Sequence, residues 1–223
     1  MKRVKLADRL LPVYSRGEEW FNAISHMAGG AFGIVALVLC VVVSALKEDG
    51  FALASSLVYG ISLILLYACS SVYHALTHLT AKKVMQVLDH CAIYFLIAGT
   101  YTPILLCIVR KEYPVTALLL FAVIWGACFL AVTLNAIDLK RYKVFSQTCY
   151  ILMGWAVLFA MDKVIATVPA AGLWWLVAGG IAYTLGAILF GLGKRLRWFH
   201  SVFHLFVLLG SAFHFVTVFG YIL

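Results

Sequence analysis

Charged residues are scarce in this chain. Asp, Glu, Lys and Arg make up 12% of its 223 residues, about half the share in an ordinary soluble domain, while hydrophobic residues reach 65% and the mean hydropathy is +1.03. This composition excludes a soluble globular domain. Apolar runs of about 20 residues recur along the chain, and each could cross a hydrocarbon core of about 30 Å as a helix. Because lipid cannot satisfy backbone hydrogen bonds, we predict an integral membrane protein built as a helical bundle.

Three other features are absent. The first 20 residues, MKRVKLADRLLPVYSRGEEW, lack the apolar core of a cleavable signal peptide, so the first span is expected to direct insertion. The six cysteines show no CxxC spacing, and we interpret them as packing residues. No linker is long enough to separate two domains. We therefore predict one domain over residues 1–223, with residues 1–21 as an amino-terminal segment before the first span.

Seven apolar runs separated by short polar connections predict an all-α membrane protein, a seven-transmembrane helix bundle. The predicted spans are Asn22–Leu46, Phe51–Thr77, Val84–Val109, Pro114–Ile137, Val144–Ala166, Gly172–Leu192 and Trp198–Leu223. Connections such as KEDG, AKK and RKEY are short, so consecutive helices should lie antiparallel and adjacent.

Lys and Arg are distributed unevenly between the two ends of this bundle. The amino-terminal segment and the second, fourth and sixth connections hold 13 of the 17, and the other side holds Lys47, Arg110, Lys111 and Lys163. Because cytoplasmic loops carry the excess of Lys and Arg, the amino terminus is predicted in the cytoplasm and the carboxyl terminus outside. The net charge of +8 is then a topology signal and an attraction to anionic lipid headgroups. We do not expect nucleic acid as a partner.

Four polar side chains are predicted at one depth near the cytoplasmic end. At a rise of about 1.5 Å per residue, His200 and His204 lie about 5 and 10 Å inside the seventh helix. By the same rise, Asp89 lies about 9 Å inside the third helix and His74 at most about 12 Å inside the second. A charge costs about 2.5 to 3.5 kcal/mol at the centre of a membrane helix, so Asp89 should face a partner or a wet cavity. Three imidazoles at its level would supply partners.

The HSVFH segment places His200 and His204 on one helix face as i and i+4 neighbours. Two such imidazoles can share a zinc ion, and His74 would complete a three-histidine set that leaves a fourth position for water. Zinc lowers the pKa of its water toward about 7, and Asp89 would hold or deprotonate that water. HxxxH alone is weak support, because a membrane histidine more often forms a hydrogen bond between helices. Both interpretations stay open from the residues alone.

Ser70 lies four residues before His74 and shares its helix face. Its hydroxyl could bond the water or a ring nitrogen, or equally a backbone carbonyl one turn back. His26, on the first helix, could line the same cavity. Boundary or packing roles outside the site are expected for the remaining histidines, His78, His90 and His214.

Four segments together resemble the hemolysin III family of bacterial membrane proteins. They are EEWFNAISHMAGG (18–30), SSVYH (70–74), LDHCAIYFLIAGTYTP (88–103) and FHSVFHLFVLLGSAFHF (199–215). That family is similar to the progestin and adiponectin receptor (PAQR) proteins, placed with alkaline ceramidases in a proposed superfamily of membrane hydrolases. The resemblance covers essentially the whole chain.

The resemblance implies a multi-pass protein of the bacterial plasma (inner) membrane with its amino terminus inside. It also implies that His74, His200 and His204 bind Zn²⁺, that Asp89 contacts the ion through water and that Ser70 lines the site. Two features depart from the receptor pattern. The gap of fifteen residues between His74 and Asp89 is slightly shorter, and a long amino-terminal cytoplasmic domain is absent, so ligand sensing through such a domain is not implied.

Three functions are compatible with these features. The first is a zinc-dependent membrane hydrolase of a lipid amide or ester, with Asp89 and Ser70 in catalytic roles and membrane lipids as the source of substrate. The second is a non-catalytic regulator or receptor-like protein of membrane homeostasis, with structural zinc. The third, a pore-forming cytolysin, ranks lowest, because such a protein must leave its cell and this one has a multispan topology without an export signal. The sequence gives neither the substrate nor the oligomeric state.

The predicted orientation can be tested by cysteine labelling. A Lys194→Cys variant should react in intact cells with a membrane-permeant maleimide and not with an impermeant one, because the sixth connection is expected in the cytoplasm. Glu48→Cys, in the first connection, is the control and should react with both reagents. Reaction of Lys194→Cys with the impermeant reagent would reverse the orientation.

Overall fold

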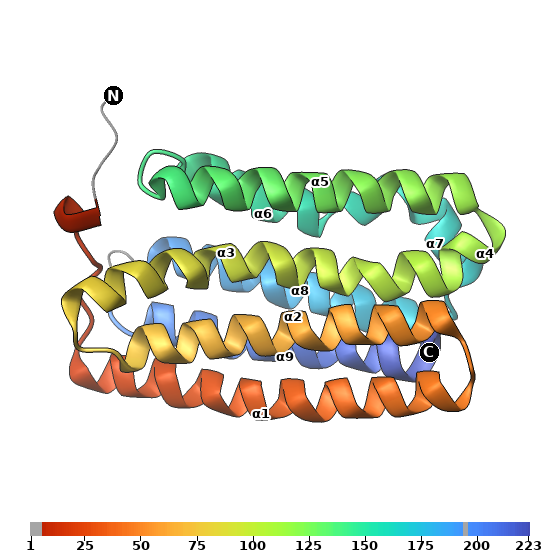
Figure 1. Ribbon diagram of the computed structural model, residues 1–223, viewed down its shortest axis with the longest axis horizontal. Coiled ribbons are helices and arrows are strands. Elements are labelled where there is room, and N and C mark those ends of the chain that lie inside the picture. Colours follow the sequence, from red (N-terminus) through yellow and green to blue (C-terminus); the bar gives the residue numbers. More distant parts are fainter. Residues whose placement is uncertain (1–5, 194–195) are drawn as a thin grey trace.

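The computed structural model describes residues 6–193 and 196–223, and seven of its helical segments are long and apolar enough to cross a membrane. They run side by side in one bundle, with the carboxyl terminus at the end opposite to the start of α1 (Figure 1). Four spans are single helices: α1 (Arg16–Leu46), α2 (Gly50–Ala75), α5 (Pro114–Asp138) and α8 (Ala170–Leu192). The predicted seven-helix architecture is confirmed.

The other three spans change helix type along their length. The third joins α3 (Leu79–Pro103), the π-helix η2 (Ile104–Val109) and α4 (Arg110–Glu112). The fifth joins α6 (Lys143–Gly154), the 3₁₀-helix η3 (Ala156–Ala160) and α7 (Met161–Thr167), and the seventh joins α9 (Phe199–Thr217) and the π-helix η4 (Val218–Ile222). A short 3₁₀-helix, η1 (Leu6–Asp8), precedes the bundle.

The largest difference from the predicted spans is at the start of α1, which begins at Arg16 rather than Asn22. Ser15 and Glu18 form a capping box: the Ser15 hydroxyl accepts the Glu18 N–H, and the Glu18 carboxylate accepts the Ser15 N–H at 2.9 Å. This reciprocal capping satisfies backbone donors of the first turn, so the helix can start within a charged segment. The first turn of α1 therefore carries Glu18 and Glu19.

Two buried hydrophobic clusters form the interior. One includes residues of α1, α2, α3 and α9, among them the fully buried Tyr59, Leu63 and Tyr67 of α2. The other includes residues of α3, α5 and the fifth span. Large hydrophobic side chains also cover the outside, as expected of a surface that faces lipid; Val123 of α5, for example, is 63% exposed. Since α3 belongs to both clusters, it joins the two parts of the bundle.

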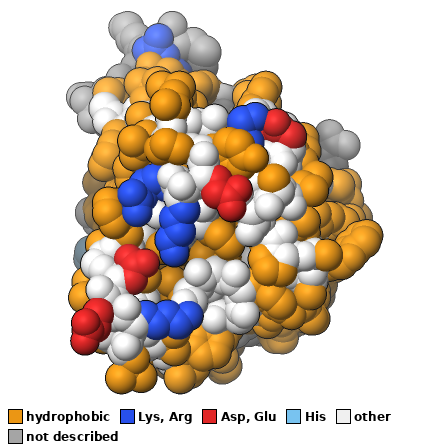
Figure 2. All heavy atoms as spheres, turned by 90° about the vertical axis from the view of Figure 1, so that its right-hand side faces the viewer, with side chains coloured by type: hydrophobic (Ala, Val, Ile, Leu, Met, Phe, Trp, Pro, Cys, Tyr) orange, Lys and Arg blue, Asp and Glu red, His pale blue; other side chains and the backbone are white. Residues whose placement is uncertain are grey.

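Charged side chains gather on the end of the bundle that carries the α1–α2 connection and the carboxyl terminus. Figure 2 shows basic and acidic groups there among hydrophobic ones. Lys163 Nζ lies 2.5 Å from Asp162 Oδ2, and the Arg110 guanidinium lies 3.6 Å from the centre of the Phe51 ring. Five bases of the predicted cytoplasmic side, Lys2, Arg3, Lys5, Lys194 and Arg195, lie outside the described residues. The orientation of the bundle stays a prediction.

The close approach of α1 and α2 depends on Gly60. A Cβ atom at this position would lie 2.8 Å from the Leu37 Cα and 2.6 Å from its Cβ, so Gly60→Ala must push the two helices apart. Small residues allow such approach in membrane bundles, and overpacking costs about 1–3 kcal/mol. We expect Gly60→Ala to lower the melting temperature of the detergent-solubilised protein. Gly126→Ala is the matched control, because a Cβ there meets no atom within 4 Å; equal melting temperatures for both variants would contradict this packing.

Candidate metal centre

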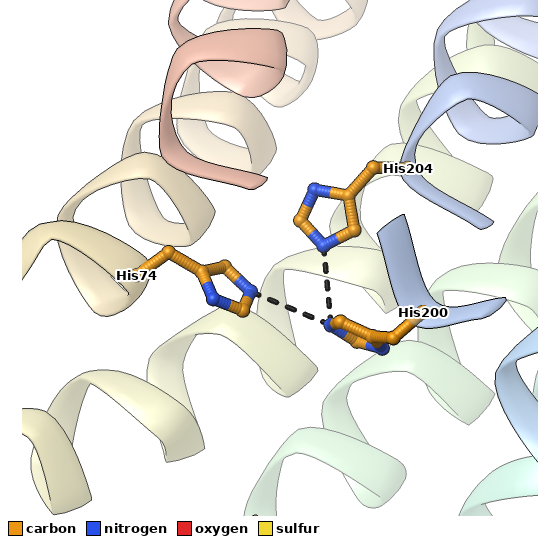
Figure 3. A group of neighbouring side chains, drawn as sticks. All are labelled: His74, His200 and His204. Carbon is orange, nitrogen blue, oxygen red and sulfur yellow. Dashed lines mark hydrogen bonds between the residues drawn. The ribbon is translucent and has the colours of Figure 1, made fainter. Parts of the chain in front are cut away.

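Three histidine side chains from two helices meet inside the bundle (Figure 3). His74 lies in the last turn of α2, and His200 and His204 lie in the first two turns of α9. Their side chains are buried, with 3%, 8% and 1% of each residue exposed. The Nε2 atom of His200 lies 3.4 Å from that of His74 and 3.2 Å from that of His204, and the three candidate ligand atoms lie within 4.8 Å of one another. The three histidines predicted at one depth are therefore brought together, and the group could hold a metal ion.

The ring nitrogens of this group cannot all be satisfied by protons. An uncharged imidazole has one N–H and one lone pair. The Nδ1 of His74 lies 2.6 Å from a Glu19 carboxylate oxygen, so it carries the proton and Nε2 offers its lone pair to the group. If His200 Nε2 carries a proton, His74 and His204 must share it. If it carries none, its lone pair faces the lone pair of His74. A cation that accepts all three lone pairs removes this conflict, and tetrahedral zinc holds its nitrogen ligands about 3.3 Å apart.

Glu18 positions the start of α9, and with it His200. The chain turns sharply at Trp198, which has a left-handed backbone (φ 67°) that is strained for a residue other than glycine. The Trp198 N–H donates to Glu18 Oε1 at 2.8 Å. The same carboxylate accepts the Ser15 hydroxyl at 2.7 Å. One buried carboxylate thus connects the first turn of α1 to the residue from which α9 starts.

Glu19 and Lys82 hold the end of α2, and with it His74. Glu19 Oε2 contacts His74 Nδ1, and Glu19 Oε1 lies 2.8 Å from Lys82 Nζ. Lys82 also donates to the carbonyl of Leu76 at 3.1 Å. A cation at this point stabilises the unpaired carbonyls at the carboxyl end of a helix.

Aromatic rings pack against the other two histidines. The Tyr14 ring stacks on His200 with ring centres 4.7 Å apart, and His26 stacks on His204 at 3.8 Å. Burial, followed by the carboxylates of Glu19 and Asp89, raises the pKa of Tyr14, so its phenol keeps its proton at neutral pH. These contacts fix the planes of the two imidazoles on α9.

A cavity of about 160 Å³ adjoins the histidines and extends along the bundle interior. Asp89 and Ser70 line it together with His26, His200 and His204. Most of its remaining wall is apolar, with side chains such as Leu96, Phe203 and Val207. Asp89 Oδ2 lies 3.7 Å from His90 Nδ1. The two polar residues predicted beside the metal site, and His26, thus share one cavity with ligand candidates on α9.

The remaining histidines lie in different places. His78 is exposed and caps α3 by accepting the Ala81 N–H at 3.3 Å, which agrees with the predicted boundary role. His90 and His214 were expected to pack away from the site, yet both line the cavity, with His214 at the far end from His200. His214 Nε2 donates to the carbonyl of Leu176 at 3.1 Å. Neither belongs to the three-histidine group.

Sequence reasoning missed Glu19, Lys82 and Tyr14. Glu19 was assigned to a segment before the first span, although Ser15 and Glu18 show the S-x-x-E spacing of a capping box ahead of an apolar run. That signal would have placed Glu19 on α1, seven residues and about two turns before His26. For Tyr14 and Lys82 no local pattern points to the site, because both reach it through the tertiary fold.

The metal site predicts the composition of the purified protein. Wild-type protein should carry about one equivalent of a divalent transition metal, and His204→Ala should lower this content sharply, because only two imidazoles remain. Elemental analysis of protein in detergent measures both. His78→Asn, which keeps a side chain able to cap α3, is the control and should retain the metal. An unchanged content in His204→Ala would exclude His204 as a ligand.

Comparison with known proteins agrees with these features. The chain is 38% identical over 206 residues to hemolysin-3 of Bacillus cereus, an alignment that covers 92% of each chain. It is 35% identical to the hemolysin-3 homolog of Bacillus subtilis (strain 168), over 92% of this chain and 94% of that protein. The human monocyte to macrophage differentiation factor is 28% identical over 90% of this chain and 83% of its own length. No solved structure gives a significant match.

A family model extends the same likeness along the chain. The Haemolysin-III related model matches residues 14–215, a range that includes all four segments quoted above and every residue of the three-histidine group. The match confirms the resemblance seen in those segments. The chain therefore belongs to the Haemolysin-III related family.

Proposed function

We propose that this protein is a zinc-dependent membrane hydrolase that acts on a lipid amide or ester. The observation that carries the proposal is the shared cavity: His200 and His204 of the buried three-histidine group border one largely apolar space inside a membrane bundle together with the acid Asp89. A lipid could enter from the bilayer and place its acyl chain among the apolar side chains. Imidazole suits several divalent metals; zinc is proposed because the two Nε2–Nε2 distances from His200, 3.4 and 3.2 Å, match the separation of about 3.3 Å between nitrogen ligands of tetrahedral zinc.

His74, His200 and His204 would hold the ion, which when bound supplies Lewis acidity for the hydrolysis of a carbonyl group. Asp89 would accept a proton from water as the water oxygen attacks the carbonyl carbon. It would return that proton to the leaving nitrogen or oxygen as the bond to carbon breaks. The Ser70 hydroxyl, buried on the same face of α2 as His74, would hydrogen-bond the attacking water or the substrate carbonyl.

Substitution of Asp89 distinguishes a catalytic zinc ion from a structural one. Asp89→Asn should lower hydrolysis by about 10²- to 10⁴-fold, the usual contribution of a general base, while the protein keeps most of its zinc. Release of fatty acid from a membrane lipid extract measures activity, and elemental analysis measures zinc. Asp162→Asn, an exposed acid at the opposite end of the bundle, is the control and should change neither value.

Two outcomes would contradict a hydrolase. Full activity in Asp89→Asn would remove Asp89 from the reaction. A folded wild-type protein that holds zinc but hydrolyses no lipid in the extract would favour the regulator, in which zinc ties α2 to α9. Pore formation is supported only by the names of the two Bacillus relatives, so it stays the third hypothesis.

A further inference from the structure

Of the three histidines, His74 is the one with a charged partner among the described residues. Its Nδ1 contacts the Glu19 carboxylate at 2.6 Å, whereas His200 and His204 are held by stacked rings. The His74 side chain is fully shielded, and those of Glu19 and Lys82 are 21% and 12% exposed. A contact this short and this shielded from water is stronger than an exposed ion pair.

Glu19 reaches His74 at the ring nitrogen that faces away from the group. Nδ1 meets the carboxylate, and Nε2 meets His200 at 3.4 Å. The carboxylate therefore acts through the imidazole. In metal sites, a carboxylate on the second ring nitrogen fixes the tautomer and the ring plane and makes the ligating nitrogen more basic.

Lys82 completes this arrangement from the start of α3. Its ammonium group lies 2.8 Å from Glu19 Oε1 and donates to the carbonyl of Leu76 at the end of α2. The carboxylate thus lies between His74 and Lys82 and cannot turn away from the ring without losing an ion pair. Its charge is also matched, which avoids the cost of an isolated charge in a shielded place.

We propose that Glu19 is a positioning residue for the metal site, because its carboxylate, held by Lys82, keeps His74 in the tautomer and orientation whose Nε2 lone pair faces His200 and His204. This inference rests on the proposed metal function, and it assigns a role to the first turn of α1. It concerns the affinity of the site for its ion and does not require a particular substrate.

The test is a zinc titration of purified full-length protein in detergent against a competing chelator dye. Glu19→Gln should raise the dissociation constant for zinc about 10- to 100-fold, the usual effect of losing such a partner. Lys82→Met should raise it less, because the carboxylate remains but loses its anchor. Glu112→Gln, an exposed acid at the other end of the bundle, should leave it unchanged.

A double-mutant cycle distinguishes positioning from a general loss of structure. If Glu19 acts through His74, adding Glu19→Gln to His74→Ala should weaken zinc binding no further, measured with a weaker competitor. The positioning role would be overturned if Glu19→Gln weakened zinc binding as much in the His74→Ala protein as in the wild type. It would also be overturned if Glu19→Gln alone left the zinc affinity unchanged. If Glu19→Gln does not fold, the double-mutant cycle is made with Lys82→Met and His74→Ala, and the same result is expected. Failure of wild-type protein to bind zinc would instead overturn the proposed function, so the two failures are distinguishable.

Discussion

Three imidazole nitrogens within 4.8 Å of one another, buried in a membrane bundle, form the constraint on which the rest of the site depends. The three rings face one another in a buried place, and a proton on His200 Nε2 can serve only one neighbour well. Burying unsatisfied polar groups is costly. The arrangement is therefore favourable when one cation accepts all three lone pairs, and the contacts around the group can be understood as the means of holding the nitrogens in that position.

Adjacent residues of α1 supply two of those contacts. Glu18 bonds the backbone of Trp198, two residues before His200, and Glu19 bonds the ring of His74. The ligand candidates come from α2 and α9, which are more than 120 residues apart in the chain. The first turn of α1 fixes the end of one helix relative to the start of the other. Contacts with α1 thus determine the distance between ligands that α1 does not itself carry.

Sequence patterns predicted the seven spans because each apolar run is long and bounded by charge. They also predicted His74, His200, His204 and Asp89 at one level, since depth follows from the helical rise. His90 was expected to pack away from the site because adjacent residues point about 100° apart around a helix, yet the cavity is wide enough for both Asp89 and His90 to line it. The start of α1 was placed too late because charged residues were taken as the end of the span, although a capping box lets a helix begin among them. Because of that boundary, Glu19 was not recognised as a residue of the first helix or of the site.

The two hydrophobic clusters of the interior involve different helices, and these helices contribute different parts of the site. The three histidines and the two carboxylates that hold them lie on α1, α2 and α9, which all contribute side chains to one of these clusters. The fifth span and α8 supply much of the opposite wall of the cavity. There the fifth span is interrupted, and the Tyr101 hydroxyl bridges the interruption: it donates to the Gly154 carbonyl and accepts the Val157 N–H. Irregular backbone at membrane depth is tolerated where it lines a cavity.

These two parts differ in what a substitution would disturb. A change among the residues that hold the histidines would alter the distances between the ring nitrogens, on which the fit of a cation depends. In the other part, Tyr150 and Trp155 of the fifth span line the cavity, whereas α8 packs directly on α9 and its Phe190 ring lies 5.7 Å from the His200 ring, centre to centre. A substitution in the fifth span therefore changes mainly the shape of the cavity, whereas one on α8 can also disturb the helix that carries two of the three histidines.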